Sequence, residues 1–118
     1  MKKTALLFIV FAFISCKNEE KTEPNITASS VEIGKNLFEG KGTCTACHKT
    51  NTKIIGPSLS EISKIYKEKN ASIVSFLKEE SEPIVDPNQY EVMKTNFAIT
   101  KSMSDEELKA LEEYILSF

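Results

Sequence analysis

The chain has 118 residues, of which 41% are hydrophobic and 27% are charged, and its formal net charge is −2. These values are ordinary for a soluble globular protein with one small domain. The sequence contains no arginine and no basic run, so it gives no sign of nucleic-acid binding.

The first fifteen residues predict a secretory signal peptide. Two lysines precede an apolar run over residues 5–14, and the small residue Ser15 follows the run. The run is too short to span a bilayer, so we expect residues 1–15 to be cleaved after export across the inner membrane. Cleavage would leave 13 lysines against 17 acidic residues, which is a formal charge of −4.

Cys16 directly follows the predicted signal peptide. The segment Phe13-Ile14-Ser15-Cys16 resembles the lipobox of bacterial lipoproteins, apart from Phe13 in a position where leucine is usual. An unpaired thiol outside the cytoplasm would be a liability, so we expect Cys16 to be acylated. The lipid would anchor the protein to a membrane, in the periplasm or at the cell surface. The alternative is an ordinary cleaved signal that leaves Cys16 as a free thiol.

Residues 16–30 form a polar and charged stretch that is broken by Pro24. A stretch of this composition cannot bury enough apolar surface to fold, so it predicts a flexible linker. The folded domain is therefore expected over residues 31–118, a length that gives only a marginal apolar core.

The domain begins with a predicted helix near Val31. Ser29 and Glu32 have the spacing of a capping box, and apolar residues follow at helical intervals. Gly40 and Gly42 are expected to end this helix.

The segment Cys44-Thr45-Ala46-Cys47-His48 comes next and carries the strongest functional signal. Its two cysteines and its histidine fall on one side of a helical turn. The thiols can add to the two vinyl groups of a haem, and the histidine is then held against the iron. This spacing is typical of covalent c-type haem attachment.

Two other interpretations of the Cys-x-x-Cys pair compete with haem attachment. A thioredoxin-like redox site requires a preceding strand, and no run of β-branched residues comes before Cys44. A structural zinc site requires four ligands, whereas the chain offers one histidine and three cysteines, one of which is Cys16. Haem attachment is therefore favoured.

Three more helices are predicted after the motif. Apolar residues at helical spacing mark residues 59–66 and 73–77, with Asn70 between them. The last helix begins at a second capping box, Ser104-x-x-Glu107, and has a clear apolar stripe. No strand pattern competes, so the sequence predicts an all-α domain of about four helices around the haem.

A methionine is the expected second ligand of the iron. The chain has one histidine, and Met1 is lost with the signal, which leaves Met93 and Met103. Met103 lies one residue before Ser104, where an apolar side chain packs as a hydrophobic staple. Met93 lies in a predicted loop that returns across the open face of the haem. Met93 is therefore the favoured ligand, with Met103 or a lysine as the alternatives.

Together, these residues resemble the small single-haem (class I) bacterial cytochromes c. In that family the ligand methionine precedes a final helix that often begins Ser-Asp-Glu-Glu, as residues 104–107 do here. The resemblance covers nearly the whole domain and implies the cytochrome c fold. It implies that the N- and C-terminal helices cross closely at Gly34, with Phe38 and Tyr114 as aromatic contact residues.

The resemblance also implies partners for the two iron ligands. The carbonyl of Pro57, which follows Gly56, would accept a hydrogen bond from His48 and fix its tautomer. Asn96 would form a hydrogen bond near the sulfur of Met93.

The expected function is that of a single-electron carrier, not an enzyme. Histidine and methionine saturate the iron, so no position is open for a substrate. One haem c is the expected cofactor, redox proteins are the expected donor and acceptor, and the protein is expected to be a monomer. The alternatives are a haem-based small-ligand sensor or weak peroxidase with a dissociable Met93, or a tethered subunit of a larger oxidoreductase.

Lysines near the site suggest how partners are attracted. Lys41, Lys49 and Lys53 flank the attachment motif, and Lys94 and Lys101 flank the favoured methionine, without an acidic residue nearby. We expect a weak basic rim around the haem edge that steers the protein to an acidic partner. A random solvated surface is the alternative.

Overall fold

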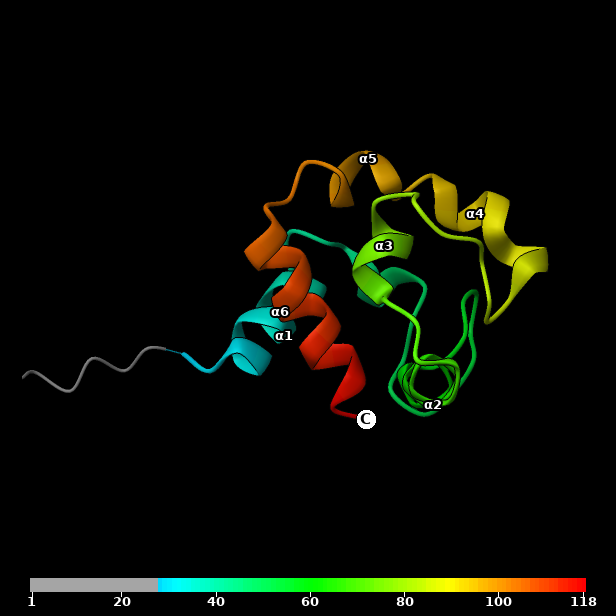
Figure 1. Cartoon of the computed structure of the whole chain (residues 1–118), viewed down its shortest axis with the longest axis horizontal. Helices are drawn as coiled ribbons and strands as arrows, with labels where there is room; N and C mark the ends of the chain where they lie inside the picture. The colour runs from blue at the N-terminus through cyan, green and yellow to red at the C-terminus, as the bar shows by residue number, and fades with distance from the viewer. Residues whose placement is uncertain (1–27) are drawn as a thin grey trace, which may run out of the picture.

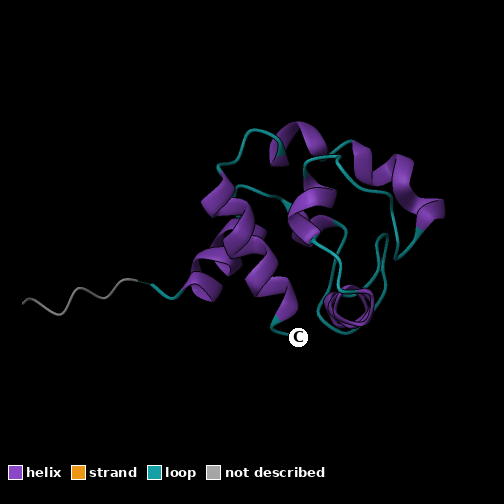
Figure 2. Cartoon of the chain, viewed as in Figure 1, coloured by secondary structure: helices purple, strands orange, loops and turns teal. Residues whose placement is uncertain are grey.

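The fold is described by a computed structural model over residues 28–118, so the predicted signal peptide, Cys16 and most of the predicted linker lie outside the described residues. The described part contains helices and loops but no strand (Figures 1 and 2). None of its helices is long and apolar enough to cross a membrane. In chain order the elements are α1 (Ser30–Glu39), the 3₁₀ turn η1 (Cys44–Ala46), α2 (Leu59–Lys69), α3 (Ile73–Leu77), the 3₁₀ turn η2 (Pro87–Gln89), α4 (Tyr90–Lys94), α5 (Phe97–Thr100) and α6 (Asp105–Leu116).

Serine residues cap the N-termini of the predicted first and last helices, which are α1 and α6. The Ser104 hydroxyl accepts a hydrogen bond from the backbone N–H of Glu107 (3.2 Å), and the Glu107 carboxylate accepts one from the N–H of Ser104 (2.9 Å). The predicted capping box is therefore confirmed. At α1, Ser29 accepts a hydrogen bond from the N–H of Glu32 (3.2 Å), but the Glu32 side chain returns none to the cap, so the capping box predicted there is only half formed. Each cap provides a partner for an N–H group that the first helical turn leaves unpaired.

Helices α1 and α6 cross at Gly34, as the resemblance implies (Figure 1). A Cβ atom on Gly34 would lie 1.9 Å from the carbonyl oxygen of Ala110 and 2.7 Å from the Cβ of Tyr114. The rings of Phe38 and Tyr114 lie beside the crossing, with their centroids 5.5 Å apart. Only glycine permits the two backbones to approach this closely.

Helix α6 also positions α3. The Glu112 carboxylate accepts hydrogen bonds from the N–H of Ile73 (2.7 Å) and the hydroxyl of Ser72 (3.1 Å) at the start of α3. At the other end of α3, the fully buried Thr100 hydroxyl of α5 donates to the carbonyl of Leu77 (2.8 Å). A long-range polar contact therefore holds each end of this five-residue helix.

Met93 lies in a helix, so the prediction that it lies in a loop is wrong. Both α4 and α5 were missed by the sequence prediction, which gave about four helices where the described residues form six. Helices of five and four residues are too short for a 3.6-residue periodicity to be recognised. The backbone of α4 packs mainly against its chain neighbours η2 and α5.

The substitution Gly34→Ala tests the helix crossing. The added methyl group overlaps the Ala110 carbonyl, so the helices must separate, and we expect a loss of about 1–3 kcal/mol in the free energy of unfolding. Guanidinium denaturation of the haem-loaded protein measures it. The control is Lys35→Ala, at an exposed position of the same helix, which should change stability by less than about 0.5 kcal/mol. Equal unfolding midpoints for the two variants would contradict the close crossing.

Candidate functional site

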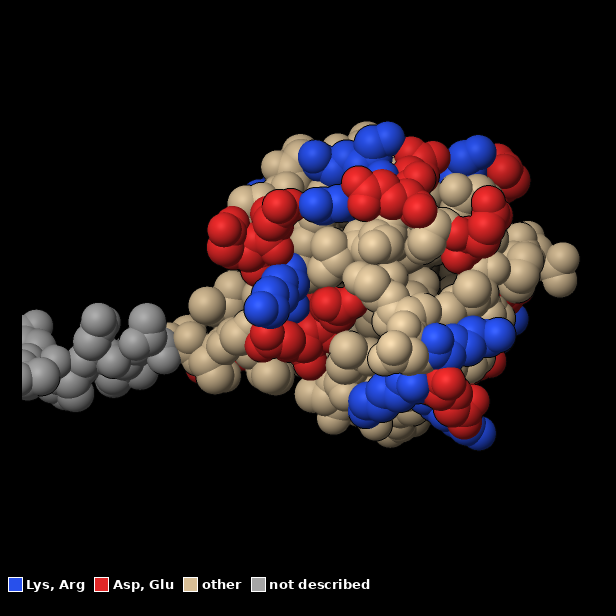
Figure 3. Space-filling view, viewed as in Figure 1, with Lys and Arg blue, Asp and Glu red and all other residues tan. Residues whose placement is uncertain are grey.

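A cavity of about 310 Å³ lies beside the attachment motif. Its lining is mostly apolar, and burial there raises the pKa of the Tyr66 phenol to about 12. Figure 3 shows an uncharged area in the middle of one face of the molecule, between rows of charged side chains. All the predicted site residues of the domain line this cavity, namely Cys44, Cys47, His48, Gly56, Pro57, Met93 and Asn96. Predicted site residues up to 52 positions apart in the chain, Cys44 and Asn96, are thus brought to one site, whereas Cys16 lies outside the described residues.

His48 is held in one orientation. Its Nδ1 atom lies 2.7 Å from the carbonyl oxygen of Pro57, the partner that the resemblance implies. Because a carbonyl can only accept, Nδ1 carries the proton and Nε2 keeps its lone pair for a metal. A Cβ atom on Gly56 would lie 2.5 Å from the His48 Cε1 atom, so a side chain there would displace the ring.

The attachment motif forms a single tight turn. The N–H groups of Cys47 and His48 both donate to the carbonyl of Cys44, over 3.1 and 3.0 Å, which brings the three side chains together. Thr43 enters the turn with a left-handed φ of 52°. Burial raises the pKa of the Cys44 thiol to about 11, so this group is a neutral thiol at neutral pH.

Residues 31–118 match the cytochrome c family model. The chain belongs to the cytochrome c family. It is therefore an all-α, haem-based electron carrier with a covalently attached c-type haem. A comparison with curated protein sequences gave no match.

The two methionines of the cytochrome c domain differ in position. Met93 is half-buried and lines the cavity from α4. Met103 is buried in the core beside the start of α6 and does not line the cavity. No lysine in the described part of the chain lines it either.

Asn96 lines the haem cavity but makes different contacts from those expected. Its side-chain N–H donates to the carbonyl of Gly42 (3.1 Å), and its oxygen accepts from the Thr43 hydroxyl (3.4 Å). The structure thus joins Asn96 to the residues just before Cys44, and not to the sulfur of Met93. Sequence reasoning missed Thr43 because a single threonine next to Cys44 gives no pattern.

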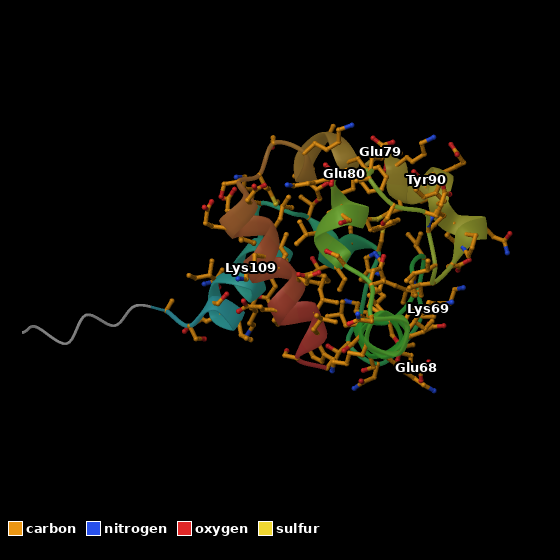
Figure 4. The ribbon with its side chains drawn as sticks, in the orientation of Figure 1. Glu68, Lys69, Glu79, Glu80, Tyr90 and Lys109 are labelled. Carbon is orange, nitrogen blue, oxygen red and sulfur yellow. The ribbon has the colours of Figure 1, made fainter. Side chains whose placement is uncertain are left out.

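The predicted basic rim around the haem edge is wrong in its premise, because most of its lysines have acidic partners. Three of these partners are distant in the sequence, so local charge counting could not find them. In Figure 3, blue and red side chains are interleaved on the visible face, and Figure 4 places Glu79 and Glu80 at the end of α3. The pairs are Lys41–Glu107 (2.8 Å), Lys53–Asp86 (2.6 Å), Lys94–Glu91 (3.3 Å) and Lys101–Glu79 (2.7 Å).

Exposed apolar side chains, not unpaired lysines, surround part of the cavity. Ile55 and Val92 line the cavity yet are 51% and 48% exposed, and the neighbouring Ile54 is 42% exposed. We call these three residues the apolar rim. Ile55 comes from the segment after His48 and Val92 from α4, so the apolar rim has members from two separate segments.

Removal of the haem should unfold most of the domain. Without the haem, the apolar side chains around a space of about 310 Å³ would lose their packing partners. A domain of this size has little stability to offset that loss. We therefore expect the amide NMR spectrum of the haem-free protein to be poorly dispersed. A well-dispersed spectrum would show that the helices pack without the haem.

Proposed function

We propose that this cytochrome c carries single electrons on a haem that is bonded to Cys44 and Cys47, with His48 and Met93 as the axial ligands. The observation that supports the ligand pair is the lining of the cavity. The lining contains Met93 and also His48, whose Nδ1 is taken up by the Pro57 carbonyl, and it contains neither Met103 nor any lysine of the described residues. The position of Met93 in the cavity, and not only its residue type, therefore supports it as the second ligand of the iron.

The bound haem would supply a one-electron iron couple. The chain's residues would hold both axial positions, which leaves none for a substrate and favours electron transfer over catalysis. The hydrogen bond from His48 to Pro57 fixes the imidazole on one side. The apolar lining excludes water, so a change of charge on the iron requires little rearrangement of the surroundings.

We further propose that electrons enter and leave at the apolar rim. Ile54, Ile55 and Val92 are exposed beside the cavity, whereas Lys53 and Lys94 near them are paired with acids. This surface fits a redox protein that has an apolar docking face, and it does not favour steering by an acidic partner.

The cellular setting remains a proposal from the sequence. A signal peptide over residues 1–15 and acylation of Cys16, as in bacterial lipoproteins, would export this cytochrome and anchor it to a membrane, in the periplasm or at the cell surface. The linker would then let a monomeric domain reach partners at the same membrane.

The substitution Met93→Ala tests the ligand pair. The wild-type oxidised protein should show the weak red absorption band that reports bonding of iron to methionine sulfur, and the variant should lack it. The reduced variant should bind carbon monoxide at least about tenfold faster, because its iron is always open. Met103→Leu is the matched control and should retain the band, since Met103 packs in the core. Loss of the band in the Met103 variant alone would reverse the assignment.

A small-ligand sensor or weak peroxidase is the second candidate function. The observation that favours it is the nature of α4, the five-residue helix that carries Met93, which lacks a side-chain cap and has no fully buried residue. Rapid carbon monoxide binding to the wild-type reduced protein would support the sensor. Slow binding would support the carrier.

The substitution Ile55→Asn tests the apolar rim without a known partner. Electron self-exchange between oxidised and reduced copies of the protein brings two haem edges together and can be measured from NMR line widths. We expect the rate to fall about fivefold, because the contact loses apolar burial of roughly 1 kcal/mol. Ile33→Asn is the control, because Ile33 is 42% exposed on α1 and does not line the cavity. Equal rates for the two variants would exclude the rim as the contact surface.

A further inference from the structure

Two of the segments that line the haem cavity are distant from each other in the chain. We call residues 42–57, with the cysteines and His48, the attachment wall, and residues 83–96, with Met93, the ligand wall. The backbone of α4 in the ligand wall lies closest to its chain neighbours, and the Tyr90 ring of α4 packs against Phe76 of α3, with centroids 6.2 Å apart. Polar contacts link the two walls in addition to this packing, and they bear on where Met93 lies.

The first of these contacts is the ion pair between Lys53 and Asp86. The Lys53 Nζ atom lies 2.6 Å from the Asp86 Oδ2 atom, across 33 residues of chain. Lys53 belongs to the attachment wall and pairs with His48 in an isolated antiparallel β-bridge. Asp86 lines the cavity and directly precedes η2, which runs into α4. The pair thus joins the segment of one iron ligand to the segment of the other.

The ion pair between Lys53 and Asp86 lies at the solvent edge of the cavity. The Asp86 side chain is only 15% exposed, whereas the Lys53 side chain is 55% exposed and reaches Asp86 from the solvent side. Breaking the pair would free this edge without removing any side chain from the apolar core.

The second contact lies at the other end of the ligand wall. The Asn96 side chain is hydrogen-bonded to Gly42 and Thr43, just before the attachment turn. Met93 is seven residues after Asp86 and three residues before Asn96. The stretch that carries Met93 is therefore tied to the attachment wall on both sides.

We propose that the Lys53–Asp86 ion pair is a latch across the edge of the haem cavity, and that it controls how often Met93 leaves the iron. Lys53 and Asp86 are positioning residues in this account, because they act through the ligand wall and not on the iron. The proposal rests on the proposed ligation by His48 and Met93. An exposed pair of this kind corresponds to roughly a two- to fivefold change in an equilibrium, which is too little to decide folding. It is enough to change the small fraction of molecules in which Met93 is dissociated.

The substitution Asp86→Asn in the haem-loaded protein tests the latch. We expect carbon monoxide to bind the reduced variant about two- to fivefold faster than the wild type, because Met93 is dissociated more often. The wild-type rate should rise toward that of the variant in about 1 M sodium chloride, which screens the pair, whereas the rate of the variant should change little. Lys53→Gln breaks the pair from the other side and should behave in the same way.

Glu79→Gln is the matched control. Glu79 forms an ion pair of similar length with Lys101 (2.7 Å), but neither residue lines the cavity. This variant removes the same charge and should leave the rate of carbon monoxide binding unchanged. The double substitution Lys53→Asp with Asp86→Lys exchanges the charges and should restore slow, salt-sensitive binding.

The outcomes separate the latch from the ligand assignment. If the wild-type oxidised protein shows the iron–methionine band and Asp86→Asn binds carbon monoxide at the wild-type rate, the latch is overturned and the ligation stands. Equal acceleration by Glu79→Gln overturns it too, because the effect would then be one of net charge. If the wild type lacks the band, the ligation fails and the latch fails with it.

Discussion

The close crossing of α1 and α6 at Gly34 fixes the half of the molecule that carries the attachment turn. From this crossing α6 presents Leu111 and Ile115 to the cavity, and its Glu112 carboxylate caps the start of α3. Helix α1 ends just before the turn that contains the two cysteines. One steric requirement, the absence of a side chain at Gly34, therefore determines the spacing of the helices around much of the haem site.

The ligand wall is built differently from the rest of the domain. Its helix α4 is short and lacks a side-chain cap, and none of its residues is fully buried. A covalent haem would hold His48 in place, whereas a methionine ligand would depend on the segment that delivers it. Under the proposed ligation, how firmly residues 83–96 are held would decide whether the domain only carries electrons or also admits a small ligand. Asp86 and Asn96 make polar contacts that tie this segment to the attachment wall.

The sequence predicted the features that depend on local patterns. The capping box at Ser104 and the break at Asn70, which has a left-handed φ of 47°, depend on neighbouring residues and were found. The crossing at Gly34 could be predicted only from the family resemblance, because a glycine within a helix does not by itself indicate which element packs against it. The lysine partners and the contacts of Asn96 could not be predicted, since most join residues 22 to 66 positions apart. The helix around Met93 was missed because it is little more than one turn long.

The hydrogen bond between His48 and Pro57 has a consequence for the electron affinity of the iron. A carboxylate partner at Nδ1 would draw the proton away and make the imidazole a stronger electron donor, which stabilises ferric iron. Here the acceptor is a neutral backbone carbonyl, and the absence of a side chain at Gly56 leaves room for the ring in this orientation. Under the proposed ligation by His48 and Met93, neither ligand would donate strongly. The thermodynamic preference of the haem would then shift toward the reduced state.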